Sequence, residues 1–279
     1  TFTHKPLDHT KQTIRLIRIL PDRSSSGFIQ CDIYHATIEA EYVCLSYMWG
    51  PPEPSQTILM NGKYHQIGPN LFDFLNVARE KYRSERLWID ALCIDQANTA
   101  ERNHQVQQMG QIYSEAQKVI IWLGKEDGLD PISRSKYAGR PTWDMVFKFS
   151  IPRYWESVFC NAYWTRAWVA QEILLARRRI ILLNTTQIPW EKLVHFAGRN
   201  LRGRRNEYEQ LFGAIRHVAA GKKSLSLIEL LFRFRQQECK VPRDRVFSLL
   251  SLCSEGKQLR AVYDLPERDL LFQILDCYK

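Results

Sequence analysis

The sequence of 279 residues lacks the features of a membrane or secreted protein. No apolar run approaches the roughly 20 residues that a helix needs to cross a bilayer. Residues 1–20 do not have the pattern of a signal peptide. Hydrophobic residues make up 45% of the chain and charged residues 25%, as in an ordinary globular protein. We therefore expect a cytoplasmic protein without a membrane span.

Common metal and phosphate motifs are also missing. The seven cysteines form no C-x-x-C pair, and the seven histidines form no H-E-x-x-H motif. An odd number of scattered cysteines indicates reduced thiols, so we expect neither a disulfide framework nor a metal site. The stretch 221–224 (GKKS) lacks the upstream glycine of a P-loop, and no G-x-G-x-x-G occurs. These absences disfavour an ordinary Rossmann oxidoreductase and predict no resident cofactor.

The net charge of +9 is concentrated in two basic runs, 177–179 and 199–205. Such runs form either a solvated basic face or a site for an anionic partner, which could be a dinucleotide, a nucleic acid or an acidic lipid. Aromatic residues are not interleaved with these runs, as a stacking platform for single-stranded nucleic acid would require. We therefore do not expect nucleic acid to be the partner.

The most informative stretch runs from residue 87 to residue 124. It begins with a short apolar run that ends in Asp90, and a polar loop follows. Asn98 and Glu101 have the spacing of a capping box, which predicts that a helix begins there. The continuous apolar run at 119–124 (VIIWLG) is typical of a strand buried on both faces. Together these elements predict a βαβ crossover in a parallel sheet, with the strands at 87–90 and 119–123 adjacent to each other.

The remaining segments predict an α/β protein with a helical last third. Asn61-Gly62 indicates a hairpin at 58–67, and Asn70 can cap a helix that ends near Tyr82. We expect a β extension at 1–40, a core at 41–190 and a helical extension at 191–279. Because the chain starts without Met and stops within a helical pattern, we expect a domain of a longer protein. Other expected strands lie at 13–20, 28–38, 41–50 and 179–183, and other helices at 142–159, 161–176, 190–198, 208–220, 225–236, 243–252 and 268–278.

Three motifs resemble the HET domain, the heterokaryon incompatibility domain of filamentous fungi. They are YVCLSYMWG at 42–50, the whole stretch 87–124, and YWTRAWVAQEILLA at 163–176. Two weaker stretches agree, at 58–75 and 241–252. The resemblance covers nearly the whole chain from residue 41. It implies fungal non-self recognition that ends in regulated cell death, with an allelic or non-allelic incompatibility protein as partner.

The HET domain is similar in turn to the TIR domain, a flavodoxin-like parallel sheet with flanking helices. In enzymatic TIR domains the stretch W-C-x-x-E-L carries the glutamate that cleaves NAD. Trp168 and Glu172 have the same spacing, although Val169 stands in place of the cysteine. The resemblance implies that Glu172 is catalytic, that NAD is the substrate, and that the protein forms a homo-oligomer. Because TIR domains also act as scaffolds, a non-enzymatic signalling module is the alternative.

Cleavage of the nicotinamide–ribose bond requires little from the protein. The reaction passes through an oxocarbenium-like centre, as glycoside hydrolysis does. Nicotinamide leaves readily, so a single carboxylate near the ribose can stabilise the developing positive charge. Glu172 could supply this carboxylate from a helix that also carries Trp164 and Trp168. The alternative role for Glu172 is a structural ion pair with Arg166.

The other candidates lie mainly where strands end, which is the edge where ligands bind in parallel sheets. Trp49 could stack on a base or plug the end of the sheet, and Asp90 and Asp95 could bind ribose hydroxyls or cap the loop. Arg102 could meet a pyrophosphate or be solvated. We expect Glu172 to face an open cleft lined by Trp49, Asp90 and Asp95. The complete predicted substrate-binding set is Ser46, Tyr47, Trp49, Gly50, Asp90, Cys93, Asp95, Gln96, Arg102, Trp164, Arg166 and Trp168, where Cys93 has a buried apolar role as its alternative.

Overall fold

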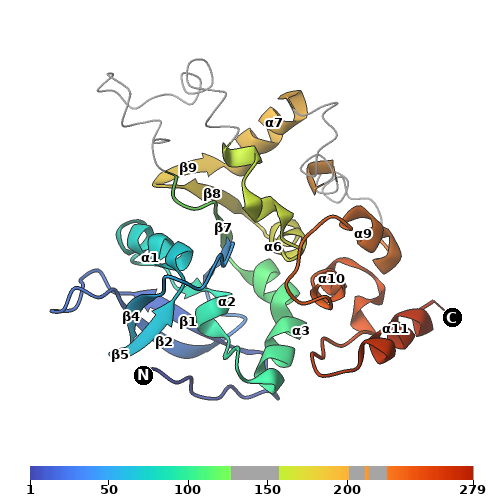
Figure 1. The fold of residues 1–279 in the computed structure, drawn as a ribbon, viewed down its shortest axis with the longest axis horizontal. Coiled ribbons are helices and arrows are strands. Elements are labelled where there is room, and N and C mark those ends of the chain that lie inside the picture. Colours follow the sequence, from blue (N-terminus) through green and yellow to red (C-terminus); the bar gives the residue numbers. More distant parts are fainter. Residues whose placement is uncertain (127–156, 201–210, 214–224, 279) are drawn as a thin grey trace.

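The computed structural model describes residues 1–126, 157–200, 211–213 and 225–278 (Figure 1). Within this part of the chain, one mixed sheet has the strand order β5-β4-β2-β1-β6-β3-β7-β8-β9. Helices pack on the sheet, which confirms the predicted α/β class. The described residues include no helix that is long and apolar enough to cross a bilayer.

The centre of the sheet consists of four parallel strands. They are β6 (Leu87–Trp88), β3 (Val43–Tyr47), β7 (Lys118–Trp122) and β8 (Arg179–Leu183), in that spatial order. Numbered along the chain, this is the order 2-1-3-4 of flavodoxin-like sheets. The predicted adjacency of 87–90 and 119–123 is wrong, because β3 lies between them and pairs with both. A crossover helix fixes the direction of two strands but allows the chain to pass over a third strand between them.

Antiparallel strands extend the sheet on both sides. The strand β1 (Thr13–Ile19) pairs with β2 (Gln30–Thr37) and with β6, and β9 (Thr186–Pro189) pairs with β8. The predicted hairpin is present as β4 (Gln56–Met60) and β5 (Lys63–Ile67), and β4 runs parallel to β2. Its turn residues Asn61 and Gly62 have φ of 48° and 74°, as a two-residue hairpin turn requires. The N-terminal β additions are thus confirmed, whereas β9 was not predicted.

Three helices lie between β5 and β7 along the chain. The helix α3 (Thr99–Glu115) begins as predicted, because the Asn98 side chain accepts a hydrogen bond from the Glu101 amide. The helix α1 (Pro69–Lys81) begins with Gly68 at the N-cap, so the prediction that Asn70 caps it is wrong. Pro69 has no N–H to satisfy and suits the first helical position. Residues 90–93, predicted as strand end and loop, form the short helix α2 (Asp90–Cys93).

The second half departs further from the prediction. The single helix expected at 161–176 is divided into a 3₁₀ turn η1 (Ala162–Thr165) and α6 (Val169–Leu174), because Arg166 is extended with ψ of 137° and bridges to Glu238. The helices predicted at 142–159 and 208–220 lie largely outside the described residues. The division into three segments at residues 40 and 190 stays a prediction. The remaining elements are α7 (Trp190–Asn200), α9 (Leu227–Arg233), α10 (Asp244–Phe247), η2 (Leu250–Leu252), η3 (Glu255–Lys257) and α11 (Glu267–Asp276).

Helices lie on both sides of the central strands, with α1 on one side and α3 and α6 on the other (Figure 1). Trp122 of β7 packs edge-on against Phe74 of α1, with ring centroids 5.8 Å apart. Ser46 of β3 points the other way and reaches Glu172 of α6. Successive side chains of a strand face opposite sides, so Tyr47, which pairs with Trp122, faces α1 while Ser46 faces α6. This alternation places Ser46 beneath α6 at the carboxyl end of β3.

Candidate functional site

A cluster of polar side chains lies at the carboxyl end of β3. Ser46 comes from the strand, Tyr163 from η1, Arg166 from the extended residue after it, and Glu172 from the first turn of α6. The break in the predicted helix makes this cluster, because it turns Arg166 back toward Glu172. In a flavodoxin-like sheet this edge is where ligands bind, near the point at which the strand order reverses.

Glu172 is held by donors on both of its oxygens. The Arg166 guanidinium contacts both carboxylate oxygens in a two-pronged ion pair, with N–O distances of 3.2 and 3.2 Å. The Ser46 hydroxyl donates to Glu172 Oε2, and the Ser46 and Tyr163 hydroxyl oxygens are 2.5 Å apart. Glu172 is only 1% exposed, whereas the Arg166 side chain is 15% exposed. The carboxylate is therefore buried, and the guanidinium separates it from solvent.

Asp90 and Trp49 form the outer part of the same cluster. The Trp49 indole N–H donates to Asp90 Oδ2 at 2.9 Å, and the Ala91 amide donates to Oδ1 at 2.7 Å. Burial, followed by the negative charge of Glu172, raises the pKa of Asp90 to about 6 against the opposing effect of Arg166 and the hydrogen bonds from Trp49 and Ala91. Trp49 is 45% exposed, so it forms a rim beside a carboxyl group that can exchange a proton near neutral pH.

The hydroxyl groups and the guanidinium in and near the cluster keep their protons. Burial, followed by the charge of Glu172, raises the pKa of the Tyr163 hydroxyl. Burial and then the charge of Asp90 likewise raise the pKa of Tyr47. Burial alone would lower the pKa of Arg166, but the charge of Glu172 and its other neighbours outweigh this effect and raise it. The site therefore contains fixed hydroxyl donors and a permanent cation around its carboxylates.

The expected open cleft is not what surrounds Glu172. Instead of facing Trp49, Asp90 and Asp95 across solvent, the carboxylate is buried against Arg166. The ion pair that the sequence offered as the alternative is therefore present. Whether the carboxylate also acts in catalysis stays a prediction.

Several of the predicted residues meet in or beside this cluster, and the others lie elsewhere. Ser46, Trp49, Asp90, Arg166 and Glu172 belong to it. Tyr47 faces α1 on the opposite side of β3, and Gly50 follows the strand with φ of 70°. Gln96 borders it, since its amide donates to the Asp90 carbonyl oxygen at 3.2 Å. Cys93 is fully buried, and burial raises the pKa of its thiol to about 12. A thiol held protonated in this way has the apolar role that was its alternative.

The two tryptophans and Arg102 pack against other parts of the chain. The Trp164 indole donates to the Val158 carbonyl oxygen at 2.6 Å and is 1% exposed. Trp168 hydrogen-bonds to the Asp244 carboxylate. The guanidinium carbon of Arg102 lies 4.1 Å from the ring centroid of Tyr263. These contacts assign Trp168 and Arg102 to packing with the last third of the chain, and Trp164 to the core beside Val158.

Two residues of the site were not predicted. Tyr163 contributes its hydroxyl, and Asn70 ties the ends of β3 and β7 together by donating to the Met48 carbonyl oxygen at 2.6 Å and accepting from the Trp122 indole at 2.8 Å. Tyr163 lies in the same motif as Trp168 and Glu172, which was the available signal. For Asn70 the sequence carried a helix-start signal only, because its use in tertiary contacts depends on strand order.

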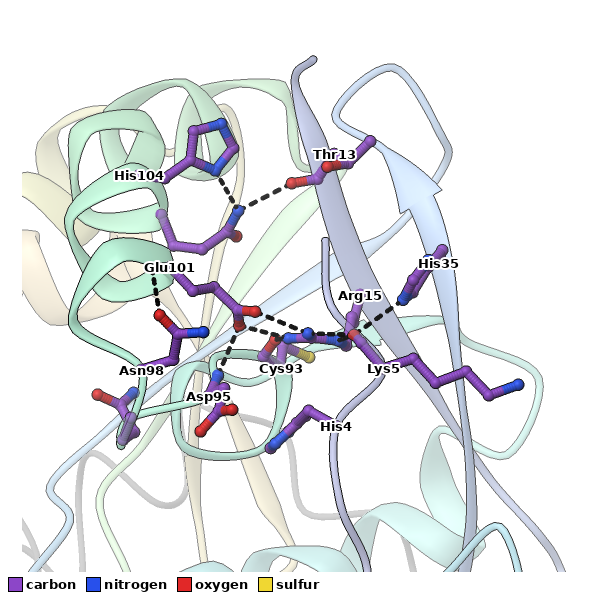
Figure 2. A network of polar contacts seen from close by, with 12 residues as sticks. His4, Lys5, Thr13, Arg15, His35, Cys93, Asp95, Asn98, Glu101 and His104 are labelled. Atoms are coloured by element: carbon purple, nitrogen blue, oxygen red, sulfur yellow. Dashed lines mark hydrogen bonds and ion pairs between the residues drawn. The ribbon is translucent and has the colours of Figure 1, made fainter. Parts of the chain in front are cut away.

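Asp95 belongs to a separate network, which Figure 2 shows. Arg15 of β1 and Glu101 of α3 are 2% and 1% exposed and form an ion pair, with N–O distances of 2.5 and 2.8 Å. The Asp95 amide donates to Glu101 Oε1 at 2.7 Å, and Arg15 also donates to the Cys93 carbonyl oxygen at 2.8 Å. The Asp95 carboxylate accepts from the Ala97 amide at 3.2 Å in the loop before α3, which is the capping contact that the sequence offered as its alternative role. Only half of the predicted capping box forms, since the Glu101 carboxylate binds Arg15.

Comparison with known proteins gives one family match and two informative relatives. The family described as "Heterokaryon incompatibility protein (HET)" matches residues 42–172, which contain every member of the Glu172 cluster. Heterokaryon incompatibility protein 6, OR allele, of Neurospora crassa is 29% identical over 162 residues, which are 52% of this chain and 24% of the relative. Vegetative incompatibility protein HET-E-1 of Podospora anserina is 29% identical over 139 residues, which are 48% of this chain and 9% of the relative. The chain therefore matches about a quarter of one relative and a tenth of the other, and no solved structure matches.

Proposed function

We propose that residues 42–172, which match the HET family, belong to a domain that acts in heterokaryon incompatibility, the non-self recognition of filamentous fungi that ends in cell death. The names of both relatives support this role, and the matched residues include the whole cluster around Glu172. The expected partner is an allelic or non-allelic incompatibility protein. The domain is the part of the protein that executes the response.

We further propose that the domain hydrolyses the nicotinamide–ribose bond of NAD at this cluster. The observation that carries the proposal is the convergence of Glu172, Asp90, Arg166 and Ser46 at the ligand edge of the sheet. Charges gathered and partly desolvated at such an edge are typical of functional sites. The Trp49 ring at the rim offers a face on which a base can stack.

Each group has a role in the proposed reaction. The bond between ribose C1′ and the nicotinamide nitrogen breaks, and its electron pair leaves with neutral nicotinamide. The Glu172 carboxylate stabilises the positive charge that develops on the ribose. Water adds to C1′ and gives up a proton, which the ionised Asp90 carboxylate accepts. With a pKa of about 6, Asp90 is mostly ionised at pH 7 and suited to this transfer.

Arg166 has to move for the substrate to reach Glu172, because the carboxylate is 1% exposed. The pyrophosphate of NAD is an anion that the guanidinium can bind with two parallel hydrogen bonds, as it binds Glu172. Exchange of one anionic partner for the other keeps Arg166 paired while Glu172 becomes accessible. The proposed substrate thus opens the site that it enters.

A non-enzymatic signalling module is the second candidate, and the closed ion pair favours it. A buried pair between Arg166 and Glu172 holds α6 against β3 whether or not a substrate exists. In this case the surface of the domain, rather than the cluster, recruits the partner. The two candidates agree on incompatibility and differ in chemistry.

Nicotinamide release separates the two candidates. The purified chain is incubated with NAD at high protein concentration, and free nicotinamide is followed by chromatography. Release that is linear in time and increases with protein concentration, with ADP-ribose or a cyclised form as the second product, is the expected result. No release above the rate in a heat-inactivated sample would leave the scaffold role as the function of the domain.

A further inference from the structure

A separate hollow lies on the first strands of the sheet. It has a volume of about 400 Å³ and lies between the N-terminal segment, β2 and the β4–β5 hairpin. Its lining includes Phe2, Lys5, Arg15, Tyr34, His35 and Lys63. None of these residues belongs to the Glu172 cluster.

The hollow exists because β2 and β4 separate after two pairs. They pair at Gln30–Leu59 and Cys31–Met60, after which β2 continues to Thr37 without β4. The Asn61 side chain, at the tip of the hairpin, accepts from the Ile33 amide at 2.9 Å and donates to the Ile33 carbonyl oxygen at 3.0 Å. The part of β2 beyond Cys31 therefore forms the floor of the hollow.

The N-terminal segment is fixed at both ends of this space. The Phe2 amide donates to the Tyr64 carbonyl oxygen of β5 at 2.8 Å. The Lys5 carbonyl oxygen accepts from Arg15 at 3.2 and 2.5 Å, and the ring nitrogen Nε2 of His35 lies 3.2 Å from it (Figure 2). The walls are therefore held by hydrogen bonds to two different strands and the hairpin, so the hollow is pre-formed.

The lining carries positive charge without acidic residues. Arg15 is neutralised by Glu101 behind it, at an N–O distance of 2.5 Å. Lys5 and Lys63 are exposed, and within the described part of the chain neither ammonium group has an ion-pair partner. Two uncompensated cations at the mouth of a partly apolar hollow favour an anionic occupant.

The apolar part of the lining is aromatic, with Phe2 and Tyr34 among its residues. The Tyr34 hydroxyl itself is out of contact with solvent, so a ligand in the hollow meets the ring and not the hydroxyl. The Phe2 ring is held edge-on against His4 and His65, at centroid distances of 4.9 and 5.5 Å. Phe2 and the ring of Tyr34 give an aromatic ligand two surfaces to contact.

We propose that this hollow binds a small aromatic phosphate of about the size of a nucleoside monophosphate. Lys5 and Lys63 bind the phosphate, and the Phe2 ring packs on the aromatic part. The volume of about 400 Å³ lies within the range of small-molecule sites. The ligand class follows from cations and aromatic rings in one pre-formed space.

Calorimetric titration of the whole chain tests this site with AMP as the probe, and with adenosine and inorganic phosphate as the two halves of AMP. AMP is expected to bind at least about tenfold more tightly than either half. Lys63→Glu is expected to weaken AMP binding about tenfold or more. The control Lys81→Glu, on an exposed lysine at the end of α1, is expected to change it less than about twofold.

Variants at the other cluster show which site the probe occupies. Glu172→Gln is expected to leave AMP binding unchanged, because that carboxylate is not part of the hollow. No AMP binding up to millimolar concentration would overturn the proposal. Binding that survives Lys63→Glu but is lost in Glu172→Gln would also overturn it, since the probe would then occupy the Glu172 cluster.

Discussion

Two buried ion pairs show how differently this chain uses the same two residue types. Around Glu101 the donors are Arg15 and the Asp95 amide, so the pair joins β1 to the start of α3. Around Glu172 the donors are Arg166 and the Ser46 hydroxyl, so the pair lies at the ligand edge of the sheet. We assign a structural role to the first pair and propose a chemical role for the second because of this difference in place.

Glu101→Gln is expected to lower the free energy of unfolding by about 3 kcal/mol, because removal of one partner leaves the Arg15 charge buried and unpaired. The matched control is Glu85→Gln, which breaks the pair with Lys118 at 2.8 Å, where both side chains are more than 20% exposed. That loss is expected to be below about 1 kcal/mol. Urea denaturation measures both, and equal losses would contradict the structural role of the Arg15–Glu101 pair.

Asp90 gives the stability of the protein a distinctive pH dependence. Its pKa is raised from 3.8 to about 6, so folding favours the protonated form. The contribution of Asp90 to stability is therefore complete below pH 4 and is lost as the pH rises through 6. Asp90→Asn cannot ionise and does not lose this contribution.

Between pH 4 and pH 7.5, the free energy of unfolding of the wild type is expected to fall relative to Asp90→Asn by about 2 kcal/mol, since one pKa unit corresponds to about 1.4 kcal/mol. Denaturant titrations of both proteins at each pH measure the difference. A difference that is constant with pH would show that Asp90 is not desolvated as the structure indicates.

At the scale of elements, the sequence predicted where strands lie and where helices begin better than it predicted which elements lie next to each other. The apolar run at 119–124 and the Asn98 cap are local signals, and both elements formed where expected. The insertion of β3 between β6 and β7 depends on the whole sheet, so a prediction based on consecutive segments missed it. The helix expected at 161–176 has unbroken helical periodicity, but tertiary pairing of Arg166 with Glu238 divides it.

The sequence predicted the site residues whose role depends on their position along the chain, and it missed features that depend on contacts with distant segments. Ser46 lies at the end of a strand, Trp49 and Asp90 follow strands, and all three were identified from this position alone. Glu172 was identified from its spacing to Trp168, but its burial was not, because burial follows from the break that turns Arg166 toward it. Tyr163 and Asn70 contribute through contacts with distant segments, and the sequence alone cannot reveal such contacts.

The packing of α3 against η2 depends on one glycine. A side-chain carbon at Gly110 would lie 2.0 Å from Ser251 Oγ and 2.2 Å from Ser251 Cβ. Gly110→Ala is therefore expected to lower the free energy of unfolding by about 2 kcal/mol through overpacking. Ser251→Gly removes both clashing atoms, so the double variant should recover most of the loss. A double-mutant cycle in urea measures the coupling, and additive losses would show that the two elements are not in this contact.

At the scale of the whole molecule, we propose that the domain assembles. This expectation comes from the resemblance to TIR domains, which form active sites between protomers. Nicotinamide release per molecule is expected to rise with protein concentration over a hundredfold range, and light scattering on the same samples should show growing assemblies. Constant release per molecule from a protein that stays monomeric throughout would contradict assembly without affecting the assignment of Glu172.

The proposal that Glu172 carries the chemistry can be tested despite its structural ion pair. Glu172→Gln removes the charge and leaves Arg166 partly unpaired, so we expect a loss of up to several kcal/mol in the free energy of unfolding. Activity must therefore be expressed per folded molecule, with the folded fraction taken from denaturant titration under the assay conditions. Glu115→Gln is the matched control, because Glu115 also pairs with an arginine, Arg177, but at the surface.

The most direct measurement is thus nicotinamide release per folded molecule in wild type, Glu172→Gln and Glu115→Gln. The account predicts release by the wild type and Glu115→Gln at similar rates. It predicts a loss on the order of a hundredfold or more in Glu172→Gln, as for other preorganised electrostatic groups. Equal release per folded molecule by all three proteins would contradict the catalytic role of Glu172, and the absence of release from the wild type would contradict NAD hydrolysis itself.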